Sequence, residues 1–354
     1  MKALSLAIAL LASVCCQVGA VSYTFRDLGM LGGSESLVKD INDSGQVVGS
    51  LDNGAGSAPY RAFLLSNGEM QSLGTLGGMN SSGYGINNSG QVVGYSNTVS
   101  GLQHAFLWQS GVMQDLGTLG GTSSYAYGIN DSGQVVGFSY TASDLQRAFL
   151  WQDGSMQDLG TLPGGLYSYA SAVNSDGQVV GDSDMGDGFS KAFLWQDGDL
   201  TNLGTLGGTS SHAYGVNDSG EVVGQSRTAD GRYHAFLWQD GLMQDLGTLP
   251  GYLYSQANDI NNSGQVVGYT SGNSNRAFLW QNGQIQDLGL LLPEDSWSAW
   301  SVAIAISNNG LIAGFAYDAD GRRHAVLWEP IPEPSSLLAL GGGILGLWGL
   351  RRRK

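Results

Sequence analysis

The chain contains seven tandem copies of one unit, and this repeat restricts the fold more than any other feature. Successive units are 42 to 45 residues apart and fill almost the whole chain of 354 residues. Taken at the residue before each recurring Leu-Gly pair, the units start at Asp27, Ser72, Asp115, Asp158, Asn202, Asp245 and Asp287. A repeat of nearly constant length predicts an array of like structural units rather than unrelated domains.

Each unit contains four short apolar segments separated by turn residues, and we interpret each segment as a β-strand. In the third unit, Tyr125 and Tyr127 alternate with Ala126 and Gly128, which is the period of a strand. The Asn-Asp-Ser-Gly and Gln-Asp-Gly sequences between segments are typical of hairpin turns. The turn Asn recurs in all seven units, at Asn42, Asn87, Asn130, Asn174, Asn217, Asn261 and Asn308.

The strands are apolar on both faces, so we expect neighbouring units to cover them. Four antiparallel strands at this period are typical of a propeller blade. The last unit ends after its third strand at Trp328, and residues 22–28 occupy a fourth-strand position. The sequence therefore predicts an all-β, seven-bladed β-propeller of four-stranded blades over residues 22–330, with the last blade closed by the N-terminal strand. The alternative, an open β-solenoid, would leave exposed edges.

The first 20 residues have the features of a secretory signal peptide. Lys2 precedes an apolar stretch, and small residues end at Ala20, the expected cleavage position. The only cysteines, Cys15 and Cys16, lie in this leader, so we expect no disulfide in the mature chain. A lipoprotein leader ending before Cys15 is the alternative, which Val14 disfavours.

The C-terminus combines three elements in order. Pro332, Glu333 and Pro334 precede residues 335–350, which are uncharged and mostly apolar, and the chain ends in Arg351, Arg352, Arg353 and Lys354. This pattern predicts a short transmembrane helix over 335–350 with its basic tail in the cytoplasm. Sixteen helical residues span about 24 Å, less than a hydrocarbon core of about 30 Å, so we expect transient anchoring in the inner membrane. The alternative is a plain C-terminal anchor.

The same three elements resemble the PEP-CTERM sorting signal of Gram-negative bacteria. The resemblance implies processing by an exosortase-type membrane protease and delivery to the cell surface or extracellular space. The repeats are similar to the HAF family of extracellular repeats, on the segments His104-Ala105-Phe106 and His234-Ala235-Phe236. That resemblance implies an extracellular setting and brings no established reaction.

A basic residue or His precedes the Ala of the third strand in every unit, at Arg61, His104, Arg147, Lys191, His234, Arg276 and His324. A catalytic group is needed once, and Arg, Lys and His are exchanged freely here. We therefore predict a repeated ion pair with the Asp of the Asp-Leu-Gly segment. Because no unit has a distinctive acid, base and nucleophile, the sequence favours a protein without catalytic residues.

The chain is acidic, with a net charge of −15, which excludes nucleic acid as a partner. The turn acids are expected on one rim of the ring, at Asp43, Asp131, Asp218, Asp153, Asp197 and Asp240. They offer at most weak calcium binding, since no unit has the ligand set of a calcium loop. We predict no metal site and no cofactor.

Aromatic residues gather near the turns between blades, on the rim that also carries the variable loops. They are Tyr125, Tyr167, Tyr169, Tyr252, Tyr254, Trp297 and Trp300. These rings could stack on sugars or pack between blades. The sequence predicts a binding or scaffold protein for exopolysaccharide or for a surface protein. The alternative is an extracellular polysaccharide-active enzyme, either a glycosidase or a lyase.

Overall fold

The computed structural model describes residues 22–30, 35–52 and 60–331. The leader, the Pro-Glu-Pro segment, the proposed transmembrane helix and the basic tail lie outside these residues. Contacts divide the chain into one unit of Phe25–Glu329 and a second unit of Met1–Thr24 and Pro330–Lys354. Within the described ranges, no helix has the length and apolar character needed to span a membrane.

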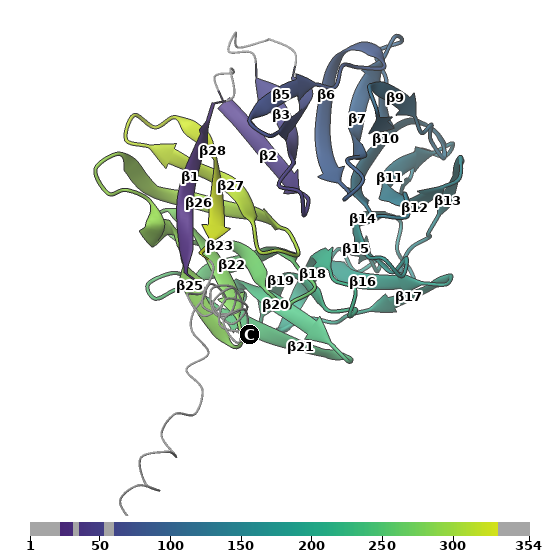
Figure 1. Cartoon of the computed structure of the whole chain (residues 1–354). Coiled ribbons are helices and arrows are strands. Elements are labelled where there is room, and N and C mark those ends of the chain that lie inside the picture. The colour runs from purple at the N-terminus through teal and green to yellow at the C-terminus, as the bar shows by residue number, and fades with distance from the viewer. Residues whose placement is uncertain (1–21, 31–34, 53–59, 332–354) are drawn as a thin grey trace, which may run out of the picture. The chain divides into compact units, whose positions relative to one another are not determined.

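The described residues form seven four-stranded antiparallel sheets, which we number as blades 1 to 7 (Figure 1). Blade 1 contains β2 (Glu35–Ile41), β3 (Val47–Asp52), β4 (Arg61–Ser66) and β5 (Glu69–Ser72). Blade 2 contains β6 (Gly77–Ile86), β7 (Val92–Thr98), β8 (Gln103–Gln109) and β9 (Val112–Asp115). Blade 3 contains β10 (Gly120–Ile129), β11 (Val135–Thr141), β12 (Gln146–Gln152) and β13 (Ser155–Asp158). Blade 4 contains β14 (Ser168–Val173), β15 (Val179–Asp184), β16 (Ser190–Gln196) and β17 (Asp199–Asn202).

The remaining blades follow the same order. Blade 5 contains β18 (Gly207–Val216), β19 (Val222–Thr228), β20 (Tyr233–Gln239) and β21 (Leu242–Gly247). Blade 6 contains β22 (Tyr254–Ile260), β23 (Val266–Ser271), β24 (Asn275–Gln281) and β25 (Gln284–Asp287), and a short 3₁₀ helix, η1 (Leu288–Leu291), follows it. Blade 7 contains β26 (Trp297–Ile306), β27 (Ile312–Asp318), β28 (Arg323–Pro330) and β1 (Tyr23–Gly29).

Blade 7 is built from both ends of the repeat array, as the sequence predicts. Its strand order is β1-β28-β27-β26, and Figure 1 shows the purple β1 beside the yellow β28. Arg26 on β1 and Glu329 on β28 form an ion pair of 3.1 Å. The fourth strand of this blade therefore comes from the start of the chain, and the ring closes by backbone pairing.

The hydrophobic core lies between blades. The cluster between blades 2 and 3 contains Ala105 and Leu107 of blade 2 together with Phe149 and Trp151 of blade 3. The third-strand Phe is fully buried in six blades, at Phe63, Phe106, Phe149, Phe193, Phe236 and Phe278. Neighbouring blades thus cover the two apolar faces of each strand, which confirms the expectation from the sequence.

Two glycine positions explain the recurring turn and strand sequences. In the third-to-fourth-strand hairpin of blade 3, Asp153 and Gly154 both have positive φ, 51° and 83°, which matches the twist of the flanking strands. On β11, a Cβ added to Gly137 would lie 1.9 Å from the carbonyl oxygen of Tyr125. The Val-Val-Gly sequence therefore recurs because a backbone carbonyl of the paired first strand occupies the space that a side chain at this glycine would need.

A buried serine joins each blade to the one before it. In blade 3, Oγ of Ser124 accepts a bond of 2.8 Å from N–H of Ala105 and donates one of 2.6 Å to the carbonyl of Gly117. The same Ala-to-Ser bond occurs at every junction, at 2.8 to 3.1 Å, through Ser36, Ser81, Ser124, Ser168, Ser211, Ser255 and Ser301. This role was not predicted from the sequence, although the Ser recurs in the first strand of every blade.

The turn asparagines form a second set of bonds between blades. Nδ2 of Asn42 donates to the backbone carbonyl of Asn87 at 3.0 Å, and each later Asn does the same to the next blade up to Asn261. The acceptor in blade 7 is Ser307, so Ser307 and not Asn308 occupies the Asn position there. The sequence alignment was one residue wrong at this turn, because an Asn stands at each of the next two positions.

Candidate functional site

The first-to-second-strand turns of all seven blades meet around a depression of about 180 Å³ at the centre of the ring. Three acids from these turns, Asp43, Asp131 and Asp218, line it together with Asn88, Ser175, Asn262 and Asn308. Asp43 accepts bonds from the backbone N–H and the side-chain amide of Asn308 at 2.6 and 3.3 Å. The carboxylates around the depression thus accept hydrogen bonds. The described residues contain no group of three or more side chains that could hold a metal ion.

Two further acids, Asp40 and Asp259, lie on the first strands of blades 1 and 6, two residues before the turn Asn. Oδ2 of Asp40 accepts the N–H of Ile86 on the next blade at 2.9 Å, and Oδ2 of Asp259 accepts that of Ile306 at 2.8 Å. Burial raises the pKa of Asp40 to about 8, with a further contribution from the charge of Asp259. Burial also raises the pKa of Asp259 to about 7. The other five blades all have Gly or Ala at this position, so these acids break the repeat.

Repeat symmetry is lost on the opposite side of the ring, near its centre, where the loops and blade-crossing turns lie. Two equivalent positions flank each junction, one on the second strand of a blade and one on the first strand of the next, and their side chains are in contact at the junctions of blades 2 and 3, 3 and 4, and 4 and 5. The pairs are Ser50 and Ser82, Tyr95 and Tyr125, Phe138 and Tyr169, Asp182 and His212, Gln225 and Gln256, Tyr269 and Val302, and Phe315 and Leu37. The positions that stabilise the fold have the same residue in most blades. The paired positions differ from one junction to the next, so we identify them as the candidate site.

An uninterrupted row of aromatic rings crosses blades 2 to 4 on this side. We call Tyr95, Tyr125, Phe138 and Tyr169 the tyrosine row. Successive ring centroids are 5.2, 4.7 and 5.1 Å apart. Phe138 is 8% exposed and forms the base, while the three tyrosines are half-buried. Rings at these separations pack favourably and hold one another in place.

Amide groups fix the hydroxyls of this row. The hydroxyl of Tyr125 donates to Oε1 of Gln103, and that of Tyr169 donates to Oε1 of Gln146. Nε2 of Gln146 in turn donates to the hydroxyl of Tyr140 at 2.7 Å. Both glutamines begin a third strand next to a variable loop, so planar amides lie along one edge of the row.

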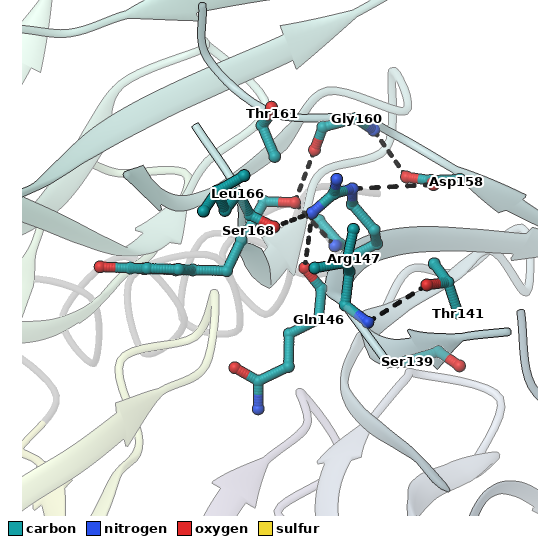
Figure 2. Close-up of polar contacts among 12 residues, drawn as sticks. Ser139, Thr141, Gln146, Arg147, Asp158, Gly160, Thr161, Leu166 and Ser168 are labelled. Carbon is teal, nitrogen blue, oxygen red and sulfur yellow. Dashed lines mark hydrogen bonds and ion pairs between the residues drawn. The ribbon is translucent and has the colours of Figure 1, made fainter. Parts of the chain in front are cut away.

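Arg147 anchors the turn that carries Leu166, as Figure 2 shows. Its Nη1 donates to the carbonyl of Leu166 and, at 3.2 Å, to that of Gln146, while Nε lies 4.0 Å from Asp158. On the other side of this turn, Oδ1 of Asp184 accepts the N–H of Leu166 at 2.6 Å. The crossing turn between blades 3 and 4 is therefore fixed from both sides before any ligand arrives.

The junction of blades 4 and 5 carries an acid and a base. Nδ1 of His212 lies 3.4 Å from Oδ1 of Asp182, and the His212 ring is 6.4 Å from the ring of Tyr233. Burial alone would raise the pKa of Tyr233, but hydrogen bonds with Ser210 and Arg227 bring it below its ordinary value. No single unit carries this pair, because the two residues lie in different units and meet only across a junction.

The aromatic residues singled out from the sequence do not form one group. Tyr125, Tyr167 and Tyr169 gather at blades 3 and 4, with the rings of Tyr167 and Tyr169 6.1 Å apart. Trp297 packs edge-on against His324 at 5.1 Å, and Trp300 packs on Tyr317 at 4.9 Å, both in blade 7. In blade 6, Tyr252 packs on the core, whereas Tyr254 is 44% exposed. Ala20, Pro332, Glu333, Pro334 and the basic tail lie outside the described residues.

The predicted ion pair is found in five blades, where it joins the third strand to the residue at the end of the fourth. His104 pairs with Asp115, Arg147 with Asp158, His234 with Asp245, Arg276 with Asp287 and His324 with Asp27, at 2.8 to 4.0 Å. In blade 4, where Asn202 replaces the acid, Lys191 pairs with Asp187 instead. In blade 1, Ser72 stands at the acid's position. These side chains support the blades, as the sequence indicated.

Solved structures similar to this chain include a β-propeller domain. The β-propeller domain of the Trilobed protease from Pyrococcus furiosus is 9% identical, with a TM-score of 0.55 over 83% of this chain and 95% of that one. TolB from Acinetobacter baumannii is 12% identical, with a TM-score of 0.47 over 80% of this chain and 63% of that one. The Trypanosoma rangeli sialidase is 12% identical, with a TM-score of 0.41 over 92% and 57%. This chain thus spans less than two thirds of the TolB and sialidase chains, and such low identities show the fold alone.

No curated protein sequence matches this chain. The similarity of its repeats to the HAF family stays a prediction. The C-terminus is assigned: residues 330–354 match the PEP-CTERM protein-sorting motif. This motif indicates export and membrane-associated sorting to the cell surface, and it implies processing by exosortase, a membrane protease.

Proposed function

We propose that this protein is an exported surface propeller that binds exopolysaccharide, without cleaving it, through the side of the ring that carries the loops. The observation that carries the proposal is the tyrosine row, with its edge of glutamine amides, on an otherwise repetitive scaffold. The sorting motif brings the chain to the cell surface, where such polymers are found.

The chemistry of the row suits sugars. A sugar ring has an apolar face of C–H groups, which an aromatic ring can cover, and an edge of hydroxyls. Planar amides such as those of Gln103 and Gln146 can both donate to and accept from hydroxyls. The fixed turn at Leu166 lowers the entropy that binding would otherwise cost, because the edge of the site is already ordered.

The test is co-sedimentation of the purified protein with exopolysaccharide from the producing organism, with size analysis of the polymer afterwards. Retention of the protein and an unchanged polymer length is the expected result. The experiment is repeated with a calcium chelator, and we expect the same retention. Absence of retention would refute polysaccharide binding and leave a surface protein as the partner.

A second candidate function is an extracellular polysaccharide-active enzyme, which the pairing of Asp182 with His212 favours. An imidazole oriented by a carboxylate is a common general acid or base. If the polymer shortens with time, the variants Asp182→Asn and His212→Gln should lose the shortening by a much larger factor than they weaken binding. Shortening that persists in both variants would exclude this pair as the catalytic group.

A further inference from the structure

We infer that the ligand is an uncharged glycan chain several sugars long, bound along one row of side chains that crosses blades 2 to 5 rather than around the whole rim. This inference rests on the proposed function and specifies its ligand and its position. This longer row consists of the tyrosine row followed by four further residues, Asp182, His212, Tyr233 and Arg227.

The contacts from Tyr95 to Tyr169 define an apolar segment of the row. Each ring in it touches the next, so no blade between 2 and 4 interrupts the apolar surface. The hydroxyls of Tyr125 and Tyr169 are held by glutamines at the same edge. Several consecutive rings with amides along one side suit consecutive sugars of a chain better than a single monosaccharide.

The next segment of the row is polar. Asp182 and His212 pair at 3.4 Å, the His212 and Tyr233 ring centroids lie 6.4 Å apart, and the guanidinium of Arg227 lies 4.9 Å from the Tyr233 centroid. Carboxylate, imidazole, phenol and guanidinium are all groups that bond to sugar hydroxyls. The two segments together give the bound chain a direction, with packing at one end and hydrogen bonding at the other.

The charge of this surface disfavours an acidic polymer. Two cations at the row are already engaged, since Arg147 bonds to Leu166 and lies beside Asp158, and Arg227 stacks on Tyr233. Asp182 lies in the row, and the chain as a whole carries a net charge of −15. A carboxylated polymer would therefore meet a carboxylate of its own sign at short range and a repulsive field at long range.

The rest of the ring lacks this arrangement among its described residues. At the junction of blades 6 and 7 the paired positions are Tyr269 and Val302, and at that of blades 7 and 1 they are Phe315 and Leu37. Trp300 is 44% exposed on blade 7, but its ring partner is Tyr317 within the same blade. Trp300 therefore provides a matched control, because it is an exposed aromatic residue of the same side that lies off the row.

The experiment is affinity electrophoresis of the full chain in gels that contain an uncharged polysaccharide (dextran, galactomannan or xyloglucan) or a carboxylated one (alginate or polygalacturonate). The variants are Tyr125→Ala, Tyr169→Ala and Gln146→Ala, with Trp300→Ala as control, and thermal unfolding confirms that each is folded. We expect retardation by at least one uncharged polymer and none by the carboxylated ones. Each Tyr variant should lose about tenfold in affinity, Gln146→Ala less, and Trp300→Ala almost nothing.

The outcomes separate the inference from the proposed function. Retardation by a carboxylated polymer as strong as by any uncharged one overturns the assignment of ligand charge. Retardation that survives all three row variants and is lost in Trp300→Ala overturns the position of the site but keeps polysaccharide binding. If the unaltered protein is not retarded by any polysaccharide and does not sediment with the native polymer, both fail. If a Tyr variant unfolds, Gln146→Ala, at the edge of the row, decides the position.

Discussion

His324 on β28 and Asp27 on β1 are 297 positions apart in the chain, yet Nδ1 of the imidazole lies 3.1 Å from both carboxylate oxygens. On its other side, Nε2 lies 3.2 Å from Oδ2 of Asp318. Only the doubly protonated ring can donate to both carboxylates at once. This pair lies within blade 7, where the first and last strands of the array meet.

The closing strand should contribute far more to stability than this ion pair alone. Removal of residues 22–28 takes one strand from blade 7 and exposes the edge of β28, so we expect a large fall in the midpoint of thermal unfolding. Asp27→Asn should cost only about 0.2–1 kcal/mol, because the pair is partly exposed to solvent. Equal midpoints for the shortened and the intact chain would disprove the shared blade.

The buried serines should be individually important. Ser124→Ala leaves the buried N–H of Ala105 without its acceptor, so we expect a loss of about 1–3 kcal/mol in the free energy of unfolding. Denaturant titration measures this loss, and Ser143→Ala, in the exposed loop of blade 3, is the control. Similar stabilities of the two variants would show that the serine bonds contribute little.

The first-to-second-strand turns are joined from blade to blade by side-chain hydrogen bonds, and one acceptor in this ring of bonds is missing. Oδ1 of Asn88, Asp131, Asp218, Asn262, Asn308 and Asp43 each accepts the N–H of the turn residue one blade earlier. Ser175, at the corresponding position of blade 4, has a shorter side chain. Ser175→Asn should supply the missing acceptor to Asp131 and stabilise the fold by about 0.5–1.5 kcal/mol, measured by denaturant titration. Ser175→Ala is the control, and a Ser175→Asn protein no more stable than Ser175→Ala would contradict the expectation.

The stability of the ring should decrease between mildly acidic and mildly alkaline pH. The pKa of Asp40 is raised to about 8 and that of Asp259 to about 7 from a value of 3.8 in the unfolded chain. In this window the unfolded chain has released protons that the folded chain still holds. The free energy of unfolding therefore falls as the pH rises from about 4 to 8.

The double variant Asp40→Gly, Asp259→Gly tests this dependence, since Gly stands at the same position in blades 2, 3 and 5. Denaturant titrations at pH 5 and pH 8 should show a smaller difference than in the unaltered protein. The slope with pH is the diagnostic quantity, because the substitutions also remove two hydrogen bonds between blades. Asp153→Asn, in an exposed hairpin turn, should leave the slope unchanged. An unaltered slope in the double variant would refute the assignment.

The blade pattern could be predicted from the sequence because it depends on local regularities. The apolar period, the Asp153–Gly154 type of turn and the Val-Val-Gly segment each recur seven times or nearly so, and each is decided within one unit. The split blade was also predictable, since a missing fourth strand at one end matched an extra strand at the other.

The candidate site could not be predicted in the same way. Asp182 and His212 are 30 positions apart in different units, and each is unremarkable within its own strand. The pairing of Tyr125 with Gln103 likewise joins a first strand to the third strand of the previous blade. A unit-by-unit comparison cannot show such contacts, because it aligns each residue with its counterparts and not with its neighbours.

The junction pairs also bear on how such a protein can change. Tyr95 faces Tyr125, Phe138 faces Tyr169, and Asp182 faces His212, so each junction has its own matched chemistry while the serine bond beside it stays the same. The unit that varies independently is therefore the residue pair at a junction, with one residue from each of two blades. New specificity would arise by exchanging both residues of a pair together. A whole blade moved to another ring would bring one residue of each of two pairs, and neither would match its new partner.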